Sequence, residues 1–326
     1  MAVMSYAGAA AAGLAAAMSA DPTVVAIGED LGRGGIFGQY RGLIETFGPE
    51  RVIDTPISEA TIVGAAVGMA LTGLKPVVEL RVIDFALCAM DEIVNQAAKN
   101  RFMFGGQGRI PAVIRMPIGI WSASAAQHSQ SLESWFAHVP GLVVVAPATP
   151  QDNHDLLRAA IRSGDPVAYF EHKELWGVEA EVDAGGTAEL GRARIARAGG
   201  DLSIVTWSKA LHWSLEAAGL LAQQGIEAEV IDLRTLWPWD RHTVLDSARR
   251  TGRVLVVHES VQVAGFGAEI VATLAESGLG GPEGAPLALA RLGGPRVPVG
   301  YSPALEAQAR IAPEQIVARA RALVQG

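Results

Sequence analysis

Short runs of aliphatic and β-branched residues alternate with longer segments of helical periodicity along almost the whole chain. In the first half, the runs that predict strands lie at residues 24–27, 51–53, 77–80, 112–115, 142–145 and 167–170. Helical patterns separate them at residues 7–18, 60–71, 84–100, 130–137 and 150–162. Such alternation is typical of βαβ units, in which a parallel sheet carries helices on both faces. We therefore expect an α/β fold.

A second alternating block follows a break in this pattern. Residues 175–188 are rich in Gly, Glu and Asp and have little periodicity, which predicts a linker. Beyond the linker, strands are predicted at residues 202–207, 228–231, 254–258 and 287–292, and helices at 210–224, 241–250, 267–276 and 313–324. The sequence thus predicts two doubly wound α/β domains in series, at residues 1–180 and 188–326.

The composition narrows the class of protein. The chain has 326 residues, half of them hydrophobic, which is enough for two sizeable cores. A formal net charge of −8 disfavours a nucleic-acid-binding protein, which would normally be basic. The single cysteine, Cys88, excludes a disulfide framework and fits a reducing compartment. No segment has the pattern of a membrane span, and the apolar run 7–18 lacks the basic flank of a signal peptide. We expect a cytoplasmic protein.

The segment Asp-Thr-Pro-Ile-Ser-Glu-Ala at residues 54–60 places one carboxylate, Glu59, between a short strand and an apolar helix. Pro56 and Ser58 are typical of a helix start. A carboxylate in the first turn can serve as a cap, which would stabilise the helix by about 0.3–1 kcal/mol, or as a chemical group. Because Ser58 can already cap the helix, Glu59 is partly surplus to that role, and both interpretations stand at this point.

Two further segments carry candidate chemistry. Residues 126–133 follow an irregular, Gly- and Pro-containing stretch that looks like a loop leaving a strand end. Loops at the carboxyl ends of strands line the ligand crevice of open α/β sheets, so His128 is a candidate proton donor or acceptor. The alternative is a histidine that bonds backbone or caps a helix. Asp84 is a good N-cap for the helix that follows, and Phe85 beside it faces either the core or the crevice mouth.

Several motifs are absent from the sequence. There is no P-loop, no nucleotide-binding Gly-x-Gly-x-x-Gly that opens a βα unit, and no Gly-x-Ser-x-Gly elbow. No His, Cys or Asp cluster has metal-ligand spacing, so we assign no metal ligand in this chain. His258 and Glu259 follow a strand, and we assign this pair a structural or interface role.

At these residues the chain resembles a known family: the beta subunit of the thiamine-diphosphate-dependent decarboxylase component of 2-oxo acid dehydrogenase complexes. The resemblance covers nearly the full length. The matching stretches are residues 54–60, 91–99, 126–136, 140–142, 170–173, 232–236, 257–259, 265–270 and 299–305. It implies a pyrimidine-binding, transketolase-like domain followed by a transketolase C-terminal-like domain.

The resemblance also implies roles for individual residues. Glu59 would contact N1′ of the cofactor's aminopyrimidine ring and favour the imino tautomer, whose nitrogen takes the proton from thiazolium C2. The backbone of Ile57 would lie beside this ring and Phe85 would pack on it. His128 would stand near the reacting carbon, where it steers or protonates the intermediate and helps acyl transfer.

The diphosphate half of such a site is missing from this sequence. That half usually reads Gly-Asp-Gly followed later by Asn, and neither residues 199–201 nor 164–166 fit it. The resemblance therefore implies an alpha subunit that holds the diphosphate and Mg²⁺, in an α2β2 heterotetramer. It further implies that the second domain builds the subunit interface and docks the dihydrolipoyl acyltransferase core. Some family members carry K⁺ near the turn corresponding to residues 163–165, and the sequence does not decide this point.

Two residues depart from the family pattern. Arg81 precedes Phe85 by four residues, where it can meet a substrate carboxylate or pair locally with Glu79 or Asp84. Trp121 is bulky and would narrow the substrate pocket. Both affect the expected substrate more than the expected reaction.

The function that follows is oxidative decarboxylation of a 2-oxo acid, pyruvate or a branched-chain acid, with acyl transfer to lipoyl groups. Acetoin dehydrogenase and a two-subunit transketolase or acyloin-forming enzyme are the alternatives. A non-catalytic assembly partner is disfavoured because Glu59 and His128 are both present. A flavin- or nucleotide-binding electron-transfer module is disfavoured by the absence of a phosphate-cradling Gly loop.

Overall fold

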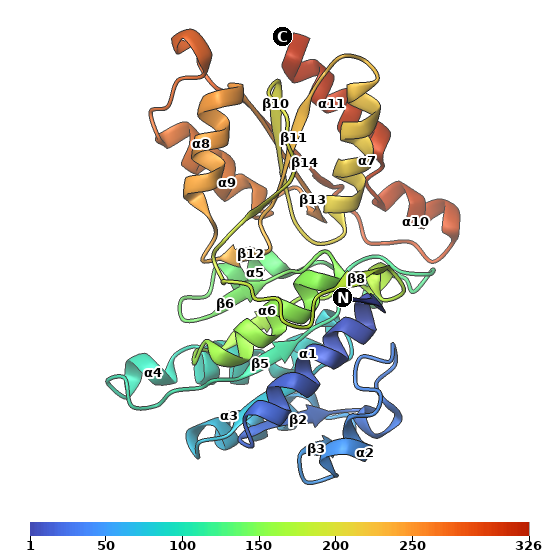
Figure 1. Ribbon diagram of the computed structural model, residues 1–326, viewed down its shortest axis with the longest axis vertical. Helices are drawn as coiled ribbons and strands as arrows, with labels where there is room; N and C mark the ends of the chain where they lie inside the picture. The colour runs from blue at the N-terminus through green and yellow to red at the C-terminus, as the bar shows by residue number, and fades with distance from the viewer. Residues whose placement is uncertain (326) are drawn as a thin grey trace. The chain divides into compact units, whose positions relative to one another are not determined.

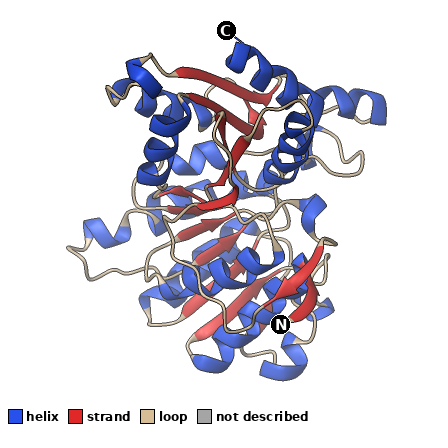
Figure 2. Cartoon of the chain, turned by 45° about the horizontal axis from the view of Figure 1, so that its top comes forward, coloured by secondary structure: helices blue, strands red, loops and turns tan. Residues whose placement is uncertain are grey.

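In a computed structural model that describes residues 1–325, the chain forms two compact units (Figure 1). The first comprises residues 1–118 and 135–190, and the second comprises residues 119–134 and those from 191 onward. The segment 119–134 lies inside the range expected for the first domain, yet it clusters with the second unit. Each unit is a sheet with helices on both of its faces (Figure 2). No helix within residues 1–325 has both the length and the apolarity needed to cross a bilayer.

The sheet of the first unit is parallel, with strand order β6-β7-β5-β4-β2-β3. The strands are β2 (Val24–Gly28), β3 (Val52–Asp54), β4 (Lys75–Glu79), β5 (Val113–Arg115), β6 (Val143–Val145) and β7 (Val167–Tyr169). Their last residues pair side by side in the row Asp54, Gly28, Glu79, Arg115, Tyr169 and Val145. This row defines the carboxyl edge of the sheet, where ligands of open α/β sheets bind.

Helices cover the two faces of this sheet. On one face, α1 (Tyr6–Ala20) packs against α6 (Pro150–Arg162), and their side chains form one core cluster with strand residues such as Val113. On the other face, α3 (Glu59–Leu71) contributes Val67 and Ala70 to a cluster that includes Ala112. Since neighbours along a strand point to opposite faces, Val113 and Ala112 serve different helical layers. The shorter helices are α2 (Leu43–Phe47), α4 (Asn100–Met103) and α5 (Glu133–Ala137).

The helix expected at residues 84–100 is instead broken into three pieces. A 3₁₀ helix spans Ile83–Ala89, a π-helical turn spans Glu92–Ala97, and α4 follows. The buried residues of the first piece include Ile83, Ala86 and Ala89, whose spacing of three matches the period of a 3₁₀ helix. Val82 occupies the cap position, so the expectation that Asp84 caps this helix was wrong. The helix expected at 130–137 is reduced to α5.

The predicted linker also carries regular structure. Strand β8 (Glu179–Val182) pairs antiparallel with β1 (Ala2–Ser5) in a two-stranded ribbon. Three of the four β8 residues are exposed, so the ribbon lacks the apolar alternation that identifies a strand in sequence. The segment 175–188, which the sequence predicted to be a linker, therefore contains a strand.

The second unit contains a sheet with strand order β14-β13-β10-β11-β9, in which only β9 runs antiparallel to its neighbour. Its strands are β9 (Arg194–Arg197), β10 (Leu202–Thr206), β11 (Ala228–Asp232), β13 (Arg253–Val261) and β14 (Ala288–Gly294), and a short strand β12 (Thr235–Trp237) follows β11. Its helices are α7 (Ala210–Ala222), α8 (Arg241–Thr251), α9 (Gly267–Glu276), α10 (Pro303–Ala309) and α11 (Pro313–Gln325). Helices α7 and α11 cover one face, and α8 and α9 cover the other (Figure 1).

Candidate active site

Glu59 begins α3, five residues after the last residue of β3, so it stands at the carboxyl edge of the first sheet. Its side chain is partly buried. Ser58 occupies the cap position of α3, but its hydroxyl donates to Oγ1 of Thr61 at 2.8 Å and accepts no backbone N–H of the helix. The expectation that Ser58 caps the helix was therefore wrong. Glu59 is the acidic residue in the first turn, next to the positive end of the helix dipole.

Three other carboxylates gather near Glu59, and the sequence analysis did not single them out as site residues. Glu29 and Asp30 follow β2 directly, and Asp54 ends β3, where its Oδ1 accepts the backbone N–H of Leu31 at 3.0 Å. Burial raises the pKa of the Glu29 carboxyl above its ordinary value; the charge of Arg81 acts in the opposite direction, and Asp30, Glu59 and Asp54 add to the rise. The signal that could have revealed this cluster is an acidic pair placed directly after a fully buried strand.

Arg81 lies two residues beyond β4, and its Nη1 is 3.6 Å from Oδ2 of Asp30. From the sequence, Glu79 and Asp84 were the expected local partners of Arg81. Instead, Glu79 lies 3.9 Å from the guanidinium of Arg115, and the ion pair of Arg81 reaches across to the residue after β2. This occurs because β2 lies beside β4 in the sheet.

Ile57 and Phe85 lie in the same unit as Glu59. Ile57 belongs to the loop before α3 and is 75% exposed. Phe85 belongs to the 3₁₀ helix after β4 and is partly buried. The strand order β4-β2-β3 brings the segments after these strands to one edge, so Glu59, Glu29, Arg81 and Phe85 all arise there.

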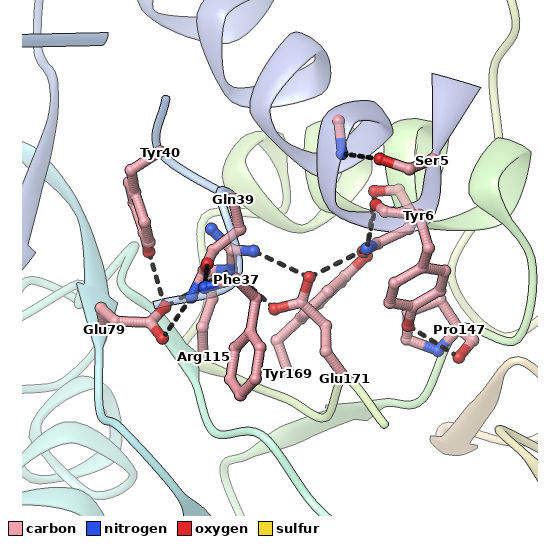
Figure 3. A network of polar contacts seen from close by, with 12 residues as sticks. Ser5, Tyr6, Phe37, Gln39, Tyr40, Glu79, Arg115, Pro147, Tyr169 and Glu171 are labelled. Atoms are coloured by element: carbon pink, nitrogen blue, oxygen red, sulfur yellow. Dashed lines mark hydrogen bonds and ion pairs between the residues drawn. The ribbon is translucent and has the colours of Figure 1, made fainter. Parts of the chain in front are cut away.

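A buried polar network holds the middle of this sheet edge (Figure 3). Arg115 is fully buried and donates to both oxygens of Glu171, while Glu79 faces the same guanidinium. The hydroxyl of Tyr40 and the amide of Gln39 donate to the two oxygens of Glu79, at 2.9 and 3.1 Å. Burial raises the pKa of Glu79 to about 7, against the opposing charge of Arg115. The network ties the loop that carries Gln39 and Tyr40 to the ends of β4 and β5.

His128 and Trp121 belong to the second unit, in the segment 119–134. His128 ends a short 3₁₀ turn, Ala126–His128, and its side chain is exposed. Trp121 is 38% exposed. A pocket of about 450 Å³ in this unit runs along the same segment, and its lining includes Ala126, Ser129 and Glu259. The two residues predicted to be catalytic, Glu59 and His128, thus come from different units of the chain.

His258, for which the sequence indicated a structural or interface role, lies inside the packed core of the second unit. His258 is fully buried, stacks on Trp207 with ring centroids 5.1 Å apart, and bonds the carbonyl and hydroxyl of Ser260. A Cβ added to Gly265 would lie 2.6 Å from its ring, so this histidine is enclosed by close-packed backbone. Among the side chains that the structure describes, no group of three or more His, Cys, Asp or Glu residues is arranged to hold a metal ion.

The fold and this site define a transketolase-like protein. Residues 2–178 match the family model for the transketolase pyrimidine-binding domain, and residues 191–316 match the model for the transketolase C-terminal domain. A solved structure described as a split-gene transketolase in an inactive beta4 tetramer shares the fold, with a TM-score of 0.82, 22% identity, and coverage of 99% of this chain and 98% of that one.

Similar proteins with assigned names narrow this class of protein to one family. The chain is 44% identical to the beta subunit of acetoin:2,6-dichlorophenolindophenol oxidoreductase of Cupriavidus necator, over 95% of this chain and 94% of that protein. It is 38% identical to the 2-oxoisovalerate dehydrogenase beta subunit of Bacillus subtilis over the full length of both, and 42% identical to a mitochondrial pyruvate dehydrogenase E1 beta subunit of Oryza sativa, over 93% and 82%. The chain belongs to the family of E1 beta subunits of 2-oxo acid and acetoin dehydrogenases, a family whose domains imply dependence on thiamine diphosphate.

Proposed function

We propose that this chain is the beta subunit of a 2-oxo acid dehydrogenase that decarboxylates pyruvate or a branched-chain 2-oxo acid and passes the acyl group to a lipoyl group. The observation that carries the proposal is the full-length match to beta subunits of this family, together with Glu59 at the start of α3. The relatives are beta subunits of multi-subunit dehydrogenases, which supports an alpha subunit as the working partner.

The residues at the first unit's sheet edge fit an aminopyrimidine ring. Such a ring offers N–H donors along its edge and apolar surface on its faces. Glu59 supplies a partly buried carboxylate acceptor, and the side chains of Ile57 and Phe85 supply partly exposed apolar surface. The negative charges of Glu29, Asp30 and Asp54 favour a partner that brings a proton to this edge.

Thiamine diphosphate, when bound, supplies the electron sink for the carbanion formed on decarboxylation. The role of this chain is to control the proton: Glu59 would hold a proton between its carboxylate and a ring nitrogen. His128 is exposed, so its ring nitrogens are accessible to exchange a proton with a reacting group. Arg81 keeps 44% of its side-chain surface exposed beside Asp30, and with Trp121 it is our candidate substrate contact.

The rest of the assembly is proposed on the family resemblance. The alpha subunit would hold the diphosphate and Mg²⁺ in an α2β2 heterotetramer, and the acyltransferase core would accept the acyl group. We place the enzyme in the cytoplasm. K⁺ binding near the turn at residues 163–165 is a further element of this proposal.

Acetoin is the second candidate substrate, because beta subunits of acetoin oxidoreductases are among the relatives at 44% and 39% identity. The test is to co-express the chain with its proposed alpha subunit and to purify the complex with thiamine diphosphate and Mg²⁺. Pyruvate, branched-chain 2-oxo acids and acetoin are then compared by their rates of reduction of 2,6-dichlorophenolindophenol. Preference for a 2-oxo acid supports the proposal, preference for acetoin selects the alternative, and inactivity with all of them rejects both.

A further inference from the structure

We propose that Glu259 and Glu306 are positioning residues that hold the backbone of the His128 loop, residues 119–131, in its working conformation. The inference deepens the proposed function, because it rests on a catalytic role for His128. The two carboxylates come from distant parts of the second unit, at the end of β13 and in α10. Neither residue is near His128 in sequence.

Glu259 joins the two ends of the loop. Its Oε2 accepts the backbone N–H of Ile120 at 3.3 Å and the hydroxyl of Ser131 at 3.0 Å. Next to these contacts, the backbone N–H of Gly119 donates to the carbonyl of Gln130 at 3.1 Å and closes the loop. One carboxylate therefore sets the distance between the segment that enters the loop after β5 and the segment that leaves it before α5.

Glu306 holds the middle of the loop. Its Oε2 accepts the backbone N–H of Ala123 at 2.6 Å, and its Oε1 accepts from Nη2 and Nε of Arg310 at 2.8 and 3.2 Å. The side chain of Glu306 is 10% exposed. Because both oxygens are engaged, the carboxylate is fixed and can fix the Ala123 amide in turn.

The backbone at the Glu306 contact needs such support. Ser122, Ala123 and Ala125 have φ values of 46°, 54° and 62°, in the left-handed region that non-glycine residues seldom occupy. Conformations of this kind persist only where the surroundings enforce them, and they cluster at functional sites. A carboxylate that binds the amide of one of these three residues supplies that enforcement.

Contacts inside the loop carry this support to His128. The Ser124 hydroxyl lies 2.6 Å from the Trp121 carbonyl, 3.1 Å from the Ser129 hydroxyl and 3.3 Å from the carbonyl of His128 itself. His128 has no long helix to orient it, since its turn contains three residues. Its position therefore follows the loop, and catalytic rates respond steeply to small misplacements of such groups.

The test combines structure and kinetics in Glu259→Ala, Glu306→Ala and the conservative Glu259→Gln and Glu306→Gln variants. Amide hydrogen exchange on the full-length chain reports on the N–H groups of Ile120 and Ala123, which the two carboxylates bind directly. We expect exchange at Ala123 to rise by about tenfold or more in Glu306→Ala, and at Ile120 in Glu259→Ala, with much smaller changes in the Gln variants, which keep an acceptor. In the complex with the alpha subunit, kcat should fall by about tenfold or more in the Ala variants with little change in KM.

A double-variant cycle separates positioning from general stability. If Glu306 acts through His128, then adding Glu306→Ala to His128→Ala should lower kcat little beyond His128→Ala alone. The matched control is Asp240→Ala, which removes the cap of α8 in the same unit by freeing the N–H groups of Thr243 and Ala193. It should leave exchange at Ile120 and Ala123, and kcat, at wild-type values.

Three outcomes would overturn the inference. They are unchanged exchange in the Ala variants, raised exchange with wild-type kcat, or multiplicative kcat losses in the double variant. An inactive wild-type complex with protected amides at Ile120 and Ala123 would reject the proposed function, and with it the positioning role that rests on it. The exchange result would still show that the carboxylates hold the loop, because that measurement does not depend on catalysis, so this failure is distinguishable from the three above.

Discussion

The guanidinium of Arg115 donates from Nε and Nη2 to the two oxygens of Glu171, at 2.8 and 2.7 Å, and both side chains are fully buried. The pair links the last residue of β5 to the segment after β7, and Asn153 of α6 donates to the same carboxylate at 2.9 Å. Figure 3 shows Arg115 between Glu171 and Glu79. A charge-assisted, two-pronged contact of this kind fixes geometry as well as charge.

Replacing Arg115 by Met should therefore destabilise the first unit strongly. The change leaves Glu171 and Glu79 buried without their cation, and loss of one partner from a buried pair costs about 3–5 kcal/mol. The measurement is the midpoint of urea unfolding. The control is Arg101→Met, which breaks a half-exposed pair with Asp165 and should cost less than about 1 kcal/mol. Equal midpoints for the two variants would contradict the assignment.

The Glu79→Gln variant should change how stability depends on pH. The folded pKa of Glu79, about 7, lies above its ordinary value of 4.5, so the folded state holds this proton more tightly than the unfolded state. The associated stability is complete below pH 4.5 and disappears as pH rises through 7. Up to about 3 kcal/mol of stability should be lost by the wild type across this window and not by the variant. Parallel unfolding curves from pH 5 to 8 would show that Glu79 does not titrate there.

Glu59→Gln should lower turnover while the fold and the complex survive. The side chain is only partly buried, so its neutral amide isostere removes proton exchange and little else. General acid–base roles typically contribute 10²- to 10⁴-fold, and we expect a loss of about that size in kcat. Circular dichroism and co-purification with the alpha subunit check the fold. Glu50→Gln, at an exposed carboxylate just before β3, is the control. A Glu59→Gln complex that works at the wild-type rate would disprove the relay.

His258 predicts an acid sensitivity of the second unit. Burial lowers the pKa of His258 to about 4, so the unfolded state, with a pKa near 6.5, binds this proton more readily. The resulting stability is present above pH 6.5 and is lost as pH falls toward 4, up to about 3 kcal/mol. Trp207 stacks on this ring, so its fluorescence follows the transition. The loss should be absent in His258→Asn and retained in His242→Asn, at a histidine whose side chain is 85% exposed.

The isolated chain should bind thiamine diphosphate with Mg²⁺ poorly. Its sequence contains no match to the Gly-Asp-Gly and Asn pattern that holds the diphosphate. Isothermal calorimetry on the lone chain and on the complex makes the comparison. Tight, Mg²⁺-dependent binding to the chain alone would reject the division of the site between two subunits.

Much of the secondary structure follows from local pattern. The helix at residues 150–162 begins with Thr149 and Pro150, a cap and a first-turn proline, and the structure places α6 at those residues. Buried strands such as β2 are continuous apolar runs, which can be recognised without knowledge of their neighbours. Local pattern failed at residues 83–89, where burial at every third position matches a 3₁₀ helix rather than an α-helix.

The sequence by itself determined the order of the main strands and helices and the place of Glu59, because a strand that ends just before an apolar helix is a local arrangement. Only the tertiary structure decided which charges meet. Arg81 pairs with Asp30 and Arg115 with Glu171, across 51 and 56 positions of the chain, because sheet order sets β2 beside β4 and β5 beside β7. Hydrophobic periodicity carries no information about which strands become neighbours, so these ion pairs could not be predicted from it.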